Sequence, residues 1–179
     1  MKGKSVLRAQ LSDPNSSLPG PDDITREELE NGITVLTRPN FNSPSVVVSG
    51  YLAAGGLFDP HDKLGLSDFS AAALMRGTAK RDFQGIYDAL ESVGASLSFN
   101  GATHTTSFSG KALSEDLPLL MELLAESLLE PVFPGRQIAR LNPVELIIVD
   151  NSEYALYRID HELQTEFQDL VFYSVLGDI

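Results

Sequence analysis

Cysteine is absent from this sequence and basic residues are scarce: among 179 residues there are 13 Lys or Arg and 25 Asp or Glu. The lack of cysteine excludes disulfides, thiolate metal sites and cysteine nucleophiles. The net charge of −12 argues against nucleic acid and anionic membranes as partners, because like charges repel, but it permits basic peptides. A chain of this length can bury about 70% of the surface that its unfolded form exposes, so it needs no metal for stability.

Long apolar runs are absent as well. No stretch approaches the roughly 20 residues of a membrane span. The first residues, Met1 to Lys4, include two lysines, but no apolar segment follows them, so we expect no signal peptide. These absences favour the cytoplasm and leave the compartment otherwise open.

The acidic residues are distributed unevenly. Residues 145–179 hold eight acidic residues and a single base, Arg158, which gives this last segment a net charge of −7. One interpretation is an acidic helix face in contact with water. The other is a surface that attracts a basic peptide or protein.

The N-terminal segment differs in composition from the rest. Residues 1–23 lack apolar periodicity and contain three prolines, which predicts a flexible arm. We expect residues 24–179 to form a single domain, in which residues 141–179 are a divergent or truncated helical tail.

Apolar spacing and turn residues predict an alternation of strands and helices. Asn31-Gly32 is a strong hairpin signal within residues 27–36. Residues 46–52 form an apolar run, which predicts a strand buried on both faces. Residues 95–100 and 105–111 predict an antiparallel pair. The expected helices cover residues 66–75, 83–93 with Asp82 as N-cap, 114–130, and a final one from Ser152. This order predicts an α+β fold, an antiparallel or mixed sheet with helices mainly on one face.

Eight short segments are unspecific one by one, but their order along the chain resembles that of a known family. They are Glu30–Leu36, Ser43–Val46, Ala54–Gly56, Gly65–Phe69, Gly77–Thr78, Ala89–Ala95, Leu113–Pro118 and Pro131–Pro134. The set resembles the pitrilysin/insulinase-type zinc peptidases, which include the mitochondrial processing peptidases. The resemblance covers about residues 27–140 and implies a metallopeptidase-like half-domain, since chains of that family usually contain two homologous halves.

Active members of that family carry His-x-x-Glu-His on their first helix. Histidines at i and i+4 share a helix face and can hold one Zn²⁺, while the Glu acts as general base. The resemblance places Asp68 and Ala72 at the two histidine positions and Ala71 at the Glu. It places Ile147 and Ile148 where the family has paired Glu residues, one of which is the third ligand. We therefore expect no catalytic residues and no metal or other cofactor, although the family cofactor is zinc.

The three histidines offer no replacement site. His61, His104 and His161 are far apart in sequence, and no pair has the i, i+3 or i, i+4 spacing of helical metal ligands. We interpret them as surface histidines. The segment Asp59-Pro60-His61-Asp62 could recruit a metal weakly, but short acidic loops are usually only hydrated.

One feature of the family does not depend on zinc. Active members bind substrate as an added strand at a sheet edge, and residues 96–103 align with that edge. The resemblance therefore implies that Ser98, Phe99, Asn100 and Gly101 form a peptide-binding edge strand, through backbone hydrogen bonds. The alternative is an ordinary edge strand that a turn interrupts.

These observations favour a non-catalytic peptidase-like subunit or peptide-binding domain that pairs with an active zinc-peptidase subunit. One alternative is a structural assembly domain without peptide binding. Another is an active zinc metallopeptidase with an unrecognised site, which Ala71 and Ala72 disfavour. The expected partners are a peptidase-family subunit or a second copy of the chain, and basic or extended peptides.

Overall fold

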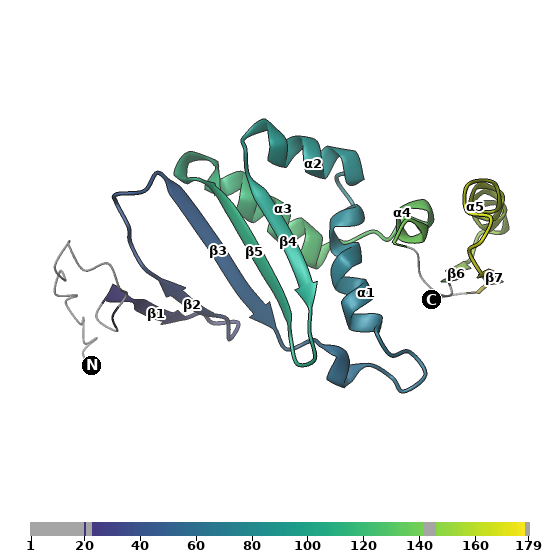
Figure 1. Ribbon diagram of the computed structural model, residues 1–179, viewed down its shortest axis with the longest axis horizontal. Helices are drawn as coiled ribbons and strands as arrows, with labels where there is room; N and C mark the ends of the chain where they lie inside the picture. Colours follow the sequence, from purple (N-terminus) through teal and green to yellow (C-terminus); the bar gives the residue numbers. More distant parts are fainter. Residues whose placement is uncertain (1–19, 21–22, 142–145, 178–179) are drawn as a thin grey trace. The chain divides into compact units, whose positions relative to one another are not determined.

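A computed structural model describes residues 20, 23–141 and 146–177 of the chain (Figure 1). The chain divides into two compact units, one up to Pro44 and one from Ser45 onward. Most of the predicted N-terminal arm, residues 1–23, lies outside the described residues. The prediction of one domain over residues 24–179 stays a prediction.

The first unit contains a β-hairpin. Strands β1 (Thr25–Glu28) and β2 (Thr34–Thr37) pair antiparallel, with Thr25 opposite Thr37. Gly32 has φ of 85°, in the left-handed region that glycine adopts without strain. The hairpin predicted around Asn31-Gly32 is confirmed.

The second unit is built on a three-stranded antiparallel sheet (Figure 1). It consists of β3 (Ser45–Leu52), β4 (Ser96–Gly101) and β5 (Thr106–Leu113), in the order β3-β5-β4. Strand β5 is central and β4 lies at an edge. The predicted antiparallel pair of residues 95–100 and 105–111 is therefore confirmed.

Three helices pack against one face of this sheet. They are α1 (Leu66–Ala73), which continues into a 3₁₀ turn at Leu74–Arg76, α2 (Phe83–Ser92) and α3 (Leu117–Leu129). The shared core combines side chains from all three helices with side chains from β4 and β5. Its buried members are Ala71, Met75, Ile86, Leu90, Leu97, Phe99, Ala112, Leu120, Leu123 and Leu124. The predicted α+β fold, with helices on one face, is confirmed.

The prediction that β3 is buried on both faces is wrong. Val47 is 65% exposed and Tyr51 is 77% exposed, whereas Val48 packs against the core. Successive side chains of a strand point to opposite faces, and the helices cover only one of them. An apolar run could not reveal this, because Val47 and Tyr51 look like core residues in sequence.

The C-terminal part of the second unit contains a short helix and a strand–helix–strand segment. The elements are α4 (Gly135–Ala139), β6 (Leu146–Asp150), α5 (Glu153–Glu166) and β7 (Phe172–Leu176). Strands β6 and β7 pair in parallel, and α5 connects them. The expected helix after Ser152 is confirmed, with the Ser152 side chain accepting from the Ala155 N–H at 3.2 Å. Strand β7 has no counterpart in the sequence prediction.

None of the helices in the described part of the chain is both long and apolar enough to cross a membrane.

Candidate functional site

Helix α1 carries Asp68, Ala71 and Ala72, the residues that the resemblance places at the family motif, and its start is held by an aspartate outside the helix. Asp59 Oδ2 accepts from the Gly65 N–H at 2.8 Å, and Oδ1 accepts from the Ser67 N–H at 3.0 Å. The first N–H groups of a helix have no partner within the helix, so these bonds stabilise the start of α1. Both oxygens of Asp59 therefore serve as helix caps, which argues against a metal role for the loop around His61.

The three motif positions lie in different environments. Asp68 and Ala72 are exposed, but Ala71 is only 3% exposed and belongs to the core cluster. An alanine methyl has no donor atom, so of these three residues only Asp68 could bind a metal. Ile147 and Ile148, at the family's paired-Glu positions, lie on β6 and are equally without donors. The residues present do not fit a catalytic zinc.

The described ranges contain no other candidate metal cluster. Among residues 23–141 and 146–177, no group of three or more His, Cys, Asp or Glu side chains is arranged to hold a metal ion. His61, His104 and His161 are all exposed. The ring of His161 stacks parallel to that of Tyr157 on α5, with centroids 6.4 Å apart.

The predicted peptide-binding strand lies at the edge of the sheet, as β4. Its side chains alternate: Leu97 and Phe99 are buried in the core, while Ser98 and Asn100 are exposed on the bare face. The Ser107 hydroxyl donates to the Asn100 carbonyl at 3.3 Å, so that carbonyl is directed toward β5.

Backbone groups alternate in direction along an antiparallel strand. Because the Asn100 carbonyl is directed toward β5, those of Ser96 and Ser98 are directed there as well. The N–H and C=O groups of Leu97, Phe99 and Gly101 are then directed to the open edge. Strand β4 can thus offer three residues of backbone hydrogen bonding to an added strand.

Helix α1 and strand β4 approach each other closely at Asp68 and Gly101. A Cβ atom added to Gly101 would lie 2.6 Å from Asp68 Cα, so only glycine allows this approach. Asp68, which the resemblance places at the first histidine of the motif, therefore lies beside the predicted peptide-binding strand.

Sequence reasoning missed a charge cluster around the buried Glu126, which connects the α1–α2 turn to α3. Glu126 is 3% exposed and accepts hydrogen bonds from the Arg81 guanidinium and, at 3.3 Å, from the Thr78 hydroxyl. Lys80 lies 3.5 Å from the same carboxylate. The hydrogen bond from Arg81 keeps the pKa of Glu126 below its usual value, despite burial, and raises the pKa of Arg81. One signal in the sequence could have indicated this cluster: Glu126 is an acidic residue among the leucines that face the core from α3.

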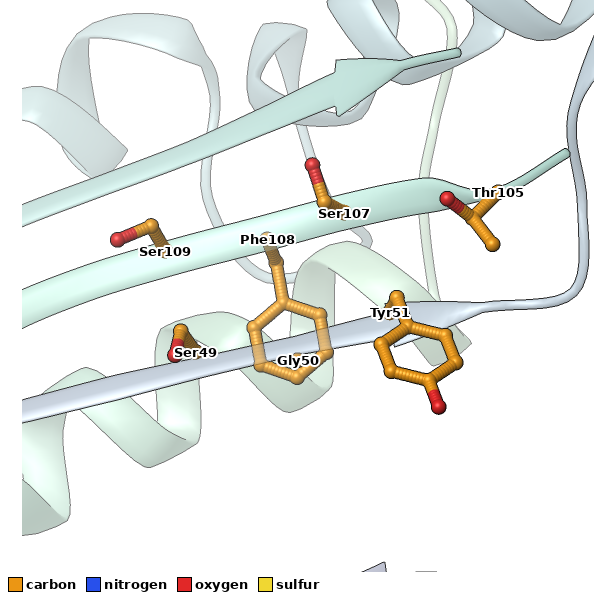
Figure 2. A pocket seen from close by; sticks show the side chains of 7 residues that line it. All are labelled: Ser49, Gly50, Tyr51, Thr105, Ser107, Phe108 and Ser109. Atoms are coloured by element: carbon orange, nitrogen blue, oxygen red, sulfur yellow. The ribbon is translucent and has the colours of Figure 1, made fainter. Parts of the chain in front are cut away.

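A shallow hollow runs along β3 and β5, and the prediction did not include it. Its lining residues are Ser49, Gly50, Tyr51, Thr105, Ser107, Phe108 and Ser109. Figure 2 shows the Phe108 ring lying over Gly50, where an added Cβ would be 2.8 Å from Phe108 Cε1. The lining offers hydroxyls and two aromatic rings but no carboxylate, histidine or lysine, so it lacks groups for acid–base catalysis near neutral pH.

Comparison with known proteins finds a family match over most of the chain. Residues 34–177 match the sequence profile of the family described as Insulinase (Peptidase family M16). The mitochondrial-processing peptidase subunit beta of Saccharomyces cerevisiae is 29% identical over 166 residues, which cover 90% of this chain and 35% of that protein. The mitochondrial cytochrome b-c1 complex subunit 1 of Bos taurus is 30% identical over 99 residues, covering 55% of this chain and 20% of that protein.

The fold is also found in a solved structure. The crystal structure of a peptidase M16 inactive domain from Pseudomonas fluorescens superposes with a TM-score of 0.59 at 21% identity, covering 82% of this chain and 31% of that one. The chain thus spans about a third of the length of the yeast relative and of this structure.

Proposed function

This chain belongs to the insulinase family (peptidase family M16), and from that premise we propose that it is a non-catalytic peptidase-like domain. In this proposal it binds extended peptides along β4 and pairs with an active zinc-peptidase subunit. One observation carries the proposal. Helix α1, in which the predicted motif positions lack metal ligands, lies next to strand β4, whose backbone groups are open at the sheet edge.

The loss of chemistry rests on residue types and on packing. Ala71 and Ala72 supply neither the general base nor the second histidine that zinc catalysis requires. Ala71 is also packed in the core, so the position of the base no longer faces a reaction centre.

Peptide binding is supported by the geometry of β4. Leu97, Phe99 and Gly101 direct backbone groups to the edge, and backbone bonding tolerates many peptide sequences. The net charge of −12 favours peptides that carry Lys or Arg.

Pairing with another subunit is supported by the relatives. The yeast relative and the bovine relative are both named as subunits of larger assemblies. The bovine name also supports the alternative, a structural assembly domain without peptide binding. The two functions differ in whether the edge of β4 is used.

Hydrogen exchange at single amides separates these functions. In the free chain, the amides of Leu97, Phe99 and Gly101 should exchange faster than those of Ser98 and Asn100, which bond to β5. Saturation with a ten-residue Lys-containing peptide of extended conformation should slow the first three at least tenfold. The same peptide with alternate amides N-methylated is the matched control, because it cannot complete the strand ladder, and it should give no protection.

Either of two results would contradict peptide binding: unchanged exchange at Leu97 and Phe99 in excess peptide, or equal protection by the N-methylated control. Pairing is measured separately. The chain is mixed with a family member that carries His-x-x-Glu-His, and complex formation and peptide cleavage are followed. A complex without protection of β4 would favour the assembly function.

A further inference from the structure

The open edge of β4 ends at Gly101. The carbonyl of Ala102 accepts from the Gly56 N–H at 3.0 Å, and the carbonyl of Thr103 accepts from the Leu57 N–H at 2.8 Å. The two carbonyls beyond Gly101 are therefore already bonded within this chain. An added strand can pair with β4 up to Gly101 and no further, which fixes one end of the peptide site.

Asp68 of α1 lies against that end of the edge. A Cβ atom added to Gly101 would collide with the Cα atom and with Oδ1 of Asp68. In Figure 1, α1 lies next to β4, and β5 lies on the other side of β4. Asp68 is exposed, whereas Ala71 is buried, so Asp68 is on the side of α1 that faces away from the core. Its carboxylate is thus placed beside the last residue with which an added strand can pair.

The Asp68 carboxylate makes no hydrogen bond or ion pair with any residue that the structure describes. Asp59 differs in this respect, because both of its oxygens accept from backbone N–H groups. An acidic residue in the first turn of a helix suits the helix dipole, and that role needs no ligand. The Asp68 carboxylate therefore remains available to a cation from outside the chain.

The pleat of the sheet decides which peptide residue meets Asp68. Gly101 is on the same face of β4 as Leu97 and Phe99, whose side chains are buried beneath the helices. Residues directly opposite each other in an antiparallel pair direct their side chains to the same face, with Cα atoms about 5.5 Å apart where they share hydrogen bonds. The peptide residue opposite Gly101 would thus direct its side chain to the α1 side, within reach of Asp68 for a long basic side chain.

We propose that Asp68 is a specificity-determining residue, which selects Lys or Arg at the peptide position opposite Gly101. The proposal rests on the proposed function, because it requires a strand added to β4. It names the residue that recognises the peptide and the position that is recognised, whereas the net charge of the chain would attract a basic residue at any position.

Peptide binding to the full chain, measured by fluorescence anisotropy at physiological salt, tests this proposal. The probes are two labelled ten-residue extended peptides with blocked ends, one with a single Lys and one with norleucine in its place, which has similar length without charge. The parent should bind the Lys peptide about threefold to fivefold more tightly, as expected for an exposed ion pair. Asp68→Asn should remove this preference and change the affinity for the norleucine peptide less than twofold.

Two further variants make the result specific. Glu115→Gln removes the same charge at an exposed carboxylate beyond the last residue of β5, Leu113, whereas Gly101 is opposite the first residue, Thr106. It should leave the preference for Lys unchanged. Asp68→Lys should reverse the selection, so that a third peptide with Glu at the same position binds more tightly than the Lys peptide. Circular dichroism checks that each variant is folded.

Chemical cross-linking tests the contact itself. A carbodiimide joins a carboxylate to an amine that it contacts, so treatment of the complex should couple the peptide Lys to Asp68. Mass spectrometry of the digested product locates the new amide bond. Coupling mainly to other carboxylates would contradict the assigned position.

Three affinity results would also overturn the proposal. If Asp68→Asn keeps the preference for Lys, or if Glu115→Gln loses it, the overall charge attracts the peptide. If Asp68→Asn weakens both peptides alike, Asp68 only stabilises α1. Amide exchange at Phe99 and Gly101 separates this failure from that of the proposed function. Protection by both peptides without a preference for Lys would overturn only the role of Asp68, whereas no protection by either would overturn both proposals.

Discussion

Replacing Ala71 by glutamate introduces the residue type that the family resemblance predicts at this position in active members. In this structure Ala71 is 3% exposed and packs within the core cluster, so the new carboxyl would enter an apolar region. We expect Ala71→Glu to destabilise the chain strongly rather than to create a general base.

The magnitude follows from two costs. Full burial of an unpaired carboxyl raises its pKa by up to about 3–5 units, which corresponds to roughly 4–7 kcal/mol at neutral pH. Overpacking adds about 1–3 kcal/mol. Because Asp68 and Ala72 on either side are exposed, the longer side chain can partly reach water, and we expect a net loss of about 3–5 kcal/mol. That is a large part of the roughly 5–15 kcal/mol by which a domain is stable.

Urea unfolding at pH 7 measures this loss, with Ala72→Glu as the matched control. Ala72 is exposed, so its variant should stay within about 0.5 kcal/mol of the parent. The penalty of Ala71→Glu should shrink as the pH falls, because a carboxyl with a raised pKa becomes neutral in the folded state first. Equal stabilities of the two variants would refute the placement of Ala71 in the core.

Three further predictions concern other contacts in the second unit. Glu126→Gln should cost about 2–4 kcal/mol in urea unfolding, because Arg81 loses a buried partner. The lowered pKa of Glu126 contributes stability above its usual value of 4.5, which is lost as the pH falls through the lowered pKa, so the variant should lose less stability in acid than the parent. Gly101→Ala should cost about 1–3 kcal/mol in thermal unfolding, because the methyl group would collide with the backbone of Asp68. Asp82→Ala removes the N-cap of α2 and should cost about 1 kcal/mol in urea unfolding.

Each of these predictions has an outcome that contradicts it. A fully stable Glu126→Gln protein would show that the ion pair between Arg81 and Glu126 contributes nothing to stability. If the variant and the parent lost the same stability in acid, another carboxylate would dominate the acid dependence. An unchanged melting temperature for Gly101→Ala would mean that α1 and β4 are farther apart than described. For Asp82→Ala, the control is Gln84→Ala, an exposed position in the first turn of the same helix, and equal effects would exclude capping.

Local signals predicted much of the fold. Asn31-Gly32 predicted the hairpin because its turn requires positive φ, which Gly32 adopts. Asp82 predicted the start of α2 because an aspartate can cap a helix, and it accepts from the Gly85 N–H at 2.8 Å. Both features depend on residues that are close together in the sequence, so a single sequence is enough to predict them.

Features that depend on distant contacts were missed. The exposure of Val47 depends on which face of the sheet the helices cover. The burial of Glu126 depends on Arg81, which is 45 residues away in sequence. Strand β7 depends on its pairing with β6, and its sequence, Phe172–Leu176, shows no clear alternation of apolar and polar residues. The positions Asp68, Ala71 and Ala72 came from the family resemblance alone.

Zinc content and peptidase activity, measured on one sample, test the central claim most directly. The purified chain is incubated with zinc and dialysed, its metal is determined by mass spectrometry, and cleavage of a quenched fluorescent peptide is followed. For the isolated chain we predict far less than one zinc per chain and no turnover of the peptide. The variant Ala72→Ser should show the same zinc content and the same lack of turnover. One tightly bound zinc together with turnover would contradict the account, and it would direct the search for ligands to His61, His104 and His161.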